Sequence, residues 1–104
     1  MVAIERFDVV GLVGLVGGRP PEPHHVESMW VAPTHRRRGV SRILVNTLAG
    51  LGRRAGLRCL MLWVLEDNTP AWRAYARLGF VPTGERQPID PAGRRFERRL
   101  RLDI

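Results

Sequence analysis

The chain is poor in cysteine and in acidic residues, and it lacks a long hydrophobic run. Its single cysteine, Cys59, cannot form an intrachain disulfide, which is typical of proteins in a reducing compartment, so we expect a cytoplasmic protein. Cys59 lies in an apolar segment, and no histidine or aspartate pattern is placed to activate it. We therefore interpret Cys59 as a core residue and not as a nucleophile.

The missing hydrophobic run argues against a membrane-spanning helix. The apolar segment at residues 9–16 is too short to cross a bilayer and is interrupted by Gly11 and Gly14. Glu5 and Asp8 are acidic, whereas a secretory signal begins with positive charge. We therefore expect no association with a membrane.

Acidic residues are outnumbered, 10 against 17 basic ones, which gives a net charge of +7. Such a balance favours a polyanionic partner, either nucleic acid, an acidic membrane surface or a phosphate-rich cofactor. A basic segment near the C-terminus is either a solvated edge strand or a nucleic-acid surface, and it comprises Arg94, Arg95, Arg98, Arg99 and Arg101. Because it lacks the interleaved aromatic residues that stack on bases, we expect no specific nucleic-acid binding.

Three strands and one helix are predicted in the first half of the chain. Residues 2–8 and 9–16 have the pattern of a hairpin, and residues 25–31 that of a third strand. The core-facing residues of this third strand are spaced three and then two apart, which requires a bulge near Ser28. Apolar spacings of three and four then predict an amphipathic helix that stops at Gly56, with a core face of Val40, Ile43, Leu44, Thr47, Leu48 and Leu51.

The second half of the chain completes a mixed α/β domain. The nearly continuous apolar run at residues 58–65 suits a strand buried on both faces. Thr69 and Pro70 are a suitable N-cap and first residue for a helix that ends at Gly79. Two further strands are expected at residues 80–87 and 95–102, on either side of a turn at 88–93. The predicted order is β-β-β-α-β-α-β-β, and 104 residues suffice for one domain, residues 1–104.

A basic, glycine-containing loop, residues 35–41, connects the third strand to the first helix. The free amides and the dipole at a helix N-terminus attract anions. Gly39 lets the backbone approach a phosphate closely, and Arg36 to Arg38 with Arg42 add positive charge. The residues alone leave two interpretations open, a phosphate site and a solvated basic loop.

A second motif, Asn68-x-x-Ala71-x-x-x-Tyr75-x-x-x-Gly79-Phe80, extends along the second helix. Helical spacing places Ala71 and Tyr75 on one face. The phenol of Tyr75 can donate a proton near neutral pH, or Tyr75 can simply be one more residue of a packed face. Trp30, Trp63 and Trp72 are candidates to line a pocket, but we interpret them as core or interface residues, which is the commoner role of tryptophan in strands and helices.

Together the two motifs resemble the GNAT family of N-acetyltransferases. Arg36-x-x-Gly39-x-Ser41, which follows Val31-Ala32-Pro33, is similar to the family's phosphate-loop signature, with Ser41 where Gly or Ala is commoner. The resemblance implies a central mixed, mostly antiparallel sheet flanked by helices. It also implies acetyl-coenzyme A as co-substrate and transfer of the acetyl group to a primary amine. The cofactor-binding residues that it implies are Val31, Arg36, Arg37, Arg38, Gly39, Val40, Ser41, Asn68, Ala71 and Tyr75.

The resemblance also assigns roles in the reaction. Loop amides would hold the pyrophosphate, Asn68 would bond the pantetheine arm, and Tyr75 would protonate the departing thiolate. The general base is expected on the strand before the loop, where Glu27 falls at a position that is commonly acidic in the family, with His24 and His25 as alternatives. His24, His25 and Glu27 lack a further ligand cluster, so we expect no metal site.

Compared with the family, the chain lacks an N-terminal strand and one or two helices that form a wall of the acceptor pocket. We therefore expect a domain that is incomplete at its N-terminus, with an acceptor amine that the sequence does not specify. Two alternatives stay open, a catalytically silent coenzyme-A-binding or interaction module and a basic nucleic-acid-binding domain. A homodimer is also left open.

Overall fold

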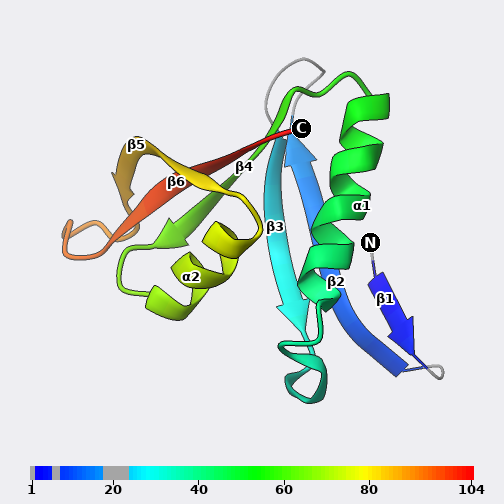
Figure 1. Ribbon diagram of the computed structural model, residues 1–104. Coiled ribbons are helices and arrows are strands. Elements are labelled where there is room, and N and C mark those ends of the chain that lie inside the picture. The colour runs from blue at the N-terminus through cyan, green and yellow to red at the C-terminus, as the bar shows by residue number, and fades with distance from the viewer. Residues whose placement is uncertain (1, 6–7, 18–23) are drawn as a thin grey trace.

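The computed structural model describes residues 2–5, 8–17 and 24–104. Six strands and two α-helices lie in these ranges, with a short 3-10 turn, η1, before the first helix (Figure 1). The chain order matches the predicted β-β-β-α-β-α-β-β. The elements are β1 (Val2–Glu5), β2 (Asp8–Gly17), β3 (His24–Val31), η1 (Pro33–His35), α1 (Val40–Arg54), β4 (Cys59–Leu65), α2 (Thr69–Arg77), β5 (Val81–Pro88) and β6 (Phe96–Asp103).

The strands form one sheet in the order β1-β2-β3-β4-β6-β5. Neighbouring strands are antiparallel except β3 and β4, which run parallel and pair only at His24 with Leu60 and at His25 with Met61. Beyond these pairs the two strands diverge, as Figure 1 shows. The sheet is therefore open between the carboxyl ends of two parallel strands, a common place for ligands in α/β proteins.

A bulge interrupts β3 where the sequence predicts one. Leu12 pairs with Trp30, whereas Gly14 pairs with Glu27, so three steps along β3 match two along β2. The extra residue lies in the segment 28–29 and changes which side of the sheet the following residues face. As a result Met29, like Val26, packs against the core.

Helix α1 covers one face of the sheet, but the buried side of the helix differs from the predicted one. Ile43 and Leu51, both expected in the core, are 63% and 49% exposed, and Thr47, also expected there, is exposed as well. The helix is rotated so that a neighbouring set of residues meets the sheet, because tertiary packing selects among adjacent apolar positions. The buried residues are Leu44, Val45, Leu48, Ala49 and Gly52.

The core is centred on β4, whose apolar run is buried on both faces from Cys59 to Leu62 as predicted, whereas Trp63 and Leu65 are half-buried. Leu60 is completely buried and Leu62 nearly so, and both belong to the cluster formed with α1. Cys59 is also buried, which confirms its interpretation as a core residue. No helix in the described ranges is long and apolar enough to cross a membrane.

The basic C-terminal strand, β6, is not an edge strand, contrary to one of the two expectations. It lies between β4 and β5, and β5 forms the edge. Three of its arginines form ion pairs with neighbouring acids. The pairs are Arg98 with Glu66 at 3.3 Å, Arg99 with Glu85 at 3.0 Å and Arg101 with Asp103 at 2.6 Å.

Candidate functional site

The loop before α1 has the open geometry expected of an anion site. Gly39 is the N-cap and adopts a left-handed conformation with φ of +81°, which glycine tolerates best. A Cβ atom at Gly39 would meet no heavy atom within 4 Å, so the space in front of it is open. No side chain caps this helix end. Its first amides are thus available to an anion.

One arginine of the loop and one of the first turn of α1 are anchored to the backbone. The Nε of Arg36 donates to the carbonyl of Val31 at 3.2 Å and thereby holds the loop to the end of β3. Nη2 of Arg42 donates to the carbonyl of Arg77 at 2.8 Å. Because Arg77 ends α2, this bond joins the start of α1 to the end of α2. Arg37 and Arg38 are exposed beside Gly39.

Asn68 is the N-cap of α2, a role that the sequence analysis gave wrongly to Thr69. Its Oδ1 accepts a hydrogen bond from the amide of Ala71 at 3.2 Å. The short asparagine side chain precedes the helix and reaches this amide, whereas Thr69 already lies within the first turn. The carboxamide nitrogen of Asn68 forms no hydrogen bond within the described chain, so the exposed side chain retains its donors.

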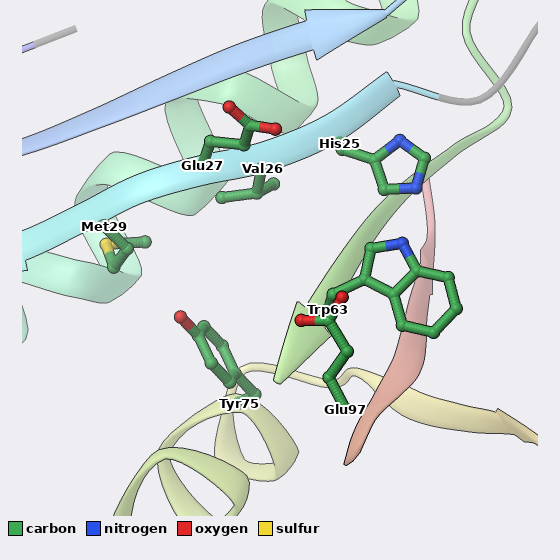
Figure 2. A pocket seen from close by; sticks show the side chains of 7 residues that line it. All are labelled: His25, Val26, Glu27, Met29, Trp63, Tyr75 and Glu97. Carbon is green, nitrogen blue, oxygen red and sulfur yellow. The ribbon is translucent and has the colours of Figure 1, made fainter. Parts of the chain in front are cut away.

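A cleft of about 670 Å³ opens where β3 and β4 diverge (Figure 2). Tyr75 from α2 and Glu27 from β3, both predicted as catalytic, line this same cleft. Trp63 also lines it, although the sequence analysis interpreted this residue as core or interface. The full lining is His25, Val26, Glu27, Met29, Trp63, Tyr75 and Glu97.

Tyr75 extends from α2 into the cleft. Its ring meets that of Phe80 edge to face, with centroids 5.7 Å apart. Figure 2 shows its hydroxyl directed toward β3, on the side where Met29 lies. Burial raises the pKa of the Tyr75 phenol above its usual value, so the hydroxyl carries its proton throughout the neutral range.

Glu27 and Tyr75 approach the cleft from different sides of β3. Figure 2 shows the Glu27 carboxylate turned away from Tyr75, and Glu27 is exposed. This separation follows from strand alternation, because Val26 faces the core and its neighbour faces the opposite side. The Glu27 carboxylate and the Tyr75 hydroxyl can therefore each reach a different atom of a molecule bound in the cleft.

The two histidines of β3 are separated by the same alternation. His24 lies on the other face, in an apolar hollow with Val13 and Leu15, and does not reach the cleft. His25 lines the cleft, and its Nε2 lies 3.0 Å from a nitrogen of Arg99. Burial, and then the charge of Arg99, lower the pKa of His25.

Sequence reasoning did not select Trp63 as a cleft residue, and it missed Glu97 altogether. Trp63 had a usable signal, because alternation along β4 places it opposite Leu62 and Val64, which face α1. Glu97 had none, since its position depends on β6 pairing with β4. In the described ranges no three His, Cys, Asp or Glu residues are grouped so as to hold a metal.

Known proteins resemble this chain in sequence and in fold. A family model described as "Acetyltransferase (GNAT) family" matches residues 2–80. Streptothricin acetyltransferase from Streptomyces lavendulae is 41% identical over 59 residues, which are 57% of this chain and 31% of that protein. The chain spans 21% to 31% of the length of the curated relatives that it matches.

Solved structures share the fold over almost the whole chain. The crystal structure of nourseothricin acetyltransferase matches with a TM-score of 0.80 and 28% identity, over 92% of this chain and 58% of that one. A GNAT family acetyltransferase from Elizabethkingia anophelis with acetyl-CoA bound matches with a TM-score of 0.81 and 16% identity, over 99% and 74% of the two chains. The fold class expected from the sequence is thereby confirmed.

Proposed function

We propose that this chain, which belongs to the acetyltransferase (GNAT) family, binds acetyl-coenzyme A and transfers its acetyl group to a primary amine. The observation that carries the proposal is the open sheet between β3 and β4. The first helix begins just after β3 and the second just after β4, so both cofactor motifs lie at the same opening. Acetyl-coenzyme A is the co-substrate of this family, and the E. anophelis relative contains it.

The cofactor would bind along the two helix starts. The pyrophosphate would accept hydrogen bonds from the amides of Gly39, Val40 and Ser41, in the open space before α1. The exposed side chains of Arg37 and Arg38 would add charge complementarity. The free donors of Asn68 suit a carbonyl of the pantetheine arm, which would extend from the loop toward α2.

In the proposed reaction the amine attacks the thioester carbonyl carbon directly. Glu27 first takes a proton from the substrate ammonium, because only the neutral amine has a lone pair with which to attack. The C–N bond forms as the C–S bond breaks, and the nitrogen then releases its second proton to solvent. Among residues 29–31, the backbone amides that point away from β2 polarise the carbonyl, since β3 has no partner strand on its β4 side beyond His25. Tyr75, protonated at neutral pH, then donates its proton to the thiolate.

The placement of Glu27 and Tyr75 supports this division of labour. The incoming amine and the departing sulfur lie on different sides of the carbonyl carbon. A base and an acid on different sides of β3 can serve one each, whereas adjacent groups would exchange a proton with each other. The side chains of Glu27 and Tyr75 lie on different sides of β3 and line the same cleft.

For the acceptor, we propose an amine of the streptothricin class. The support is the name of the relative that is 41% identical, together with that of nourseothricin acetyltransferase at 28% identity. The carboxylates of Glu27 and Glu97 in the cleft lining suit a positively charged amine.

The test is a transfer assay with acetyl-coenzyme A and streptothricin. We expect thiol release and acetylated streptothricin, found by mass spectrometry, in equal amounts and at a rate that depends on the amine. A reaction without the amine is the control for hydrolysis. Saturable acetyl-coenzyme A binding without transfer to streptothricin or other amines would instead favour the silent coenzyme-A-binding module.

A further inference from the structure

Arg99 of β6 connects the cleft to the edge strand. Its Nη1 donates to both carboxylate oxygens of Glu85, at 3.2 and 3.0 Å, and its Nη2 lies 3.0 Å from Nε2 of His25. The guanidinium carbon is 5.8 Å from the centre of the Trp63 ring, and the side chain is only 19% exposed. Arg99 is therefore held on three sides, by an acid, an imidazole and an aromatic ring.

An irregularity in β5 places Glu85 beside Arg99. Pro82 pairs with Leu100 and Arg86 pairs with Arg98, so the three residues 83–85 lie opposite the single residue Arg99. Within this bulge Gly84 has a φ of +92°, a conformation that favours glycine.

Thr83 fixes the bulge by two hydrogen bonds. Its hydroxyl donates to the carbonyl of Arg99 at 3.3 Å and accepts from the amide of Glu85 at 3.1 Å. The orientation of Glu85 is thus built into the backbone of the edge strand.

The contact with Arg99 specifies the protonation state of His25. A guanidinium has only donors, so Nε2 of His25 must be the acceptor. An imidazole that accepts at Nε2 is neutral and carries its hydrogen on Nδ1. This Nδ1–H has no acceptor among the residues that the structure describes.

We propose that Arg99, oriented by Glu85, is a positioning residue that holds His25 as a neutral imidazole, whose Nδ1–H donates to an oxygen of the acceptor substrate. The substrate part rests on the proposed function. His25 lies at the closed end of the cleft, at the last pair between β3 and β4. A carbonyl or hydroxyl oxygen near the reacting amine would satisfy this donor, whereas a bare alkylammonium would not.

The charges around His25 agree with a neutral ring. The groups that act on it are Arg99 from β6, Glu85 from β5, and Glu27 and His24 from β3. Burial and Arg99 lower the pKa of His25, and they outweigh the two glutamates, which raise it. Because the lone pair of Nε2 is engaged by Arg99, His25 has no free basic nitrogen to serve as the general base, and Glu27 keeps that proposed role.

Nitrogen-15 NMR of the full chain tests the arrangement without any substrate. The His25 signals are assigned by their loss in His25→Asn. We expect the neutral Nδ1–H tautomer at neutral pH. Arg99→Met should raise the pKa of His25 and leave the ring free to carry its hydrogen on Nε2 as well. Arg101→Met is the matched control, because Arg101 lies two residues along the same strand and pairs with Asp103.

Two NMR results would overturn the proposal. One is a His25 that is protonated, or carries its hydrogen on Nε2, in the parent chain at neutral pH. The other is an Arg99→Met variant in which His25 has the same pKa and the same tautomer as in the Arg101→Met control.

Kinetics with the acceptor amine of the transfer assay test the substrate contact. His25→Leu should raise KM for the amine roughly fivefold to tenfold, as for one lost hydrogen bond, with kcat little changed. His25→Asn keeps a side-chain N–H and should recover much of the loss, with the pH profile unchanged. A large fall in kcat, together with the loss of an inflection from the pH profile of the reaction, would show that His25 is a base and contradict the proposal. A parent chain that transfers nothing contradicts the proposed function alone, because the tautomer is measured without substrate.

Discussion

Replacing Gly39 with leucine tests where the pyrophosphate binds. The φ of +81° is a conformation that costs an L-residue about 1–2 kcal/mol. No heavy atom lies within 4 Å of the new Cβ, so the Cβ itself adds no steric overlap to this cost. A domain of this kind has a free energy of unfolding of roughly 5–15 kcal/mol, so Gly39→Leu should still fold.

Binding should suffer far more than folding. The leucine side chain would occupy the space through which a phosphate reaches the amides at the start of α1. A hydrogen bond to a charged group contributes about 1.5–3 kcal/mol. Losing two such bonds therefore weakens acetyl-coenzyme A binding by at least about a hundredfold.

Gly93→Leu is the matched control for this variant. Gly93 also has a positive φ, +63°, and open space around its Cβ position, but it lies in the turn between β5 and β6. Chemical unfolding should show similar losses of stability for the two variants. Calorimetry with acetyl-coenzyme A should show normal affinity for Gly93→Leu and lost affinity for Gly39→Leu. Equal affinity of the two variants would refute the assignment of the loop.

Three further changes test the remaining parts of the account. Tyr75→Phe should bind acetyl-coenzyme A normally but turn over roughly a hundredfold more slowly or worse, and undiminished turnover would mean that Tyr75 only packs. Leu60→Ala, at a fully buried position, should lower the free energy of unfolding by about 2–5 kcal/mol in urea titration, and a loss well below this would contradict its place in the core. The lowered pKa of His25 contributes stability that is present above the unfolded pKa of about 6.5 and lost as pH falls through the folded pKa. His25→Asn should therefore flatten the slope of stability below pH 6.5, and an unchanged slope would contradict the pKa shift.

Much of the fold could be predicted because local patterns determine it. The apolar run of β4 and the uneven spacing around Ser28 each correspond to one arrangement of the backbone, and both predictions are confirmed. The prediction of the buried face of α1 was wrong at Ile43, Thr47 and Leu51, since several faces of the helix were apolar enough to pack. The N-cap of α2 was wrong because Asn68 and Thr69 are both good caps, and only the backbone geometry selects between them.

The site was predictable to a different extent. Motif spacing led to Tyr75 and the family resemblance led to Glu27, and the structure brings both to one cleft. Their catalytic roles stay predictions. The contact of Arg99 with Glu85 and His25 joins β6, β5 and β3, which lie far apart in the sequence. Such contacts follow from strand order, which no local pattern specified.

A crystal structure of the chain with acetyl-coenzyme A would test the central claim most directly. The account predicts that the pyrophosphate lies against the amides of residues 39–41 and that the thioester lies between β3 and β4. The sulfur should then be within hydrogen-bonding distance of the Tyr75 hydroxyl. Acetyl-coenzyme A bound elsewhere on the protein, or a thioester remote from Tyr75, would contradict the account.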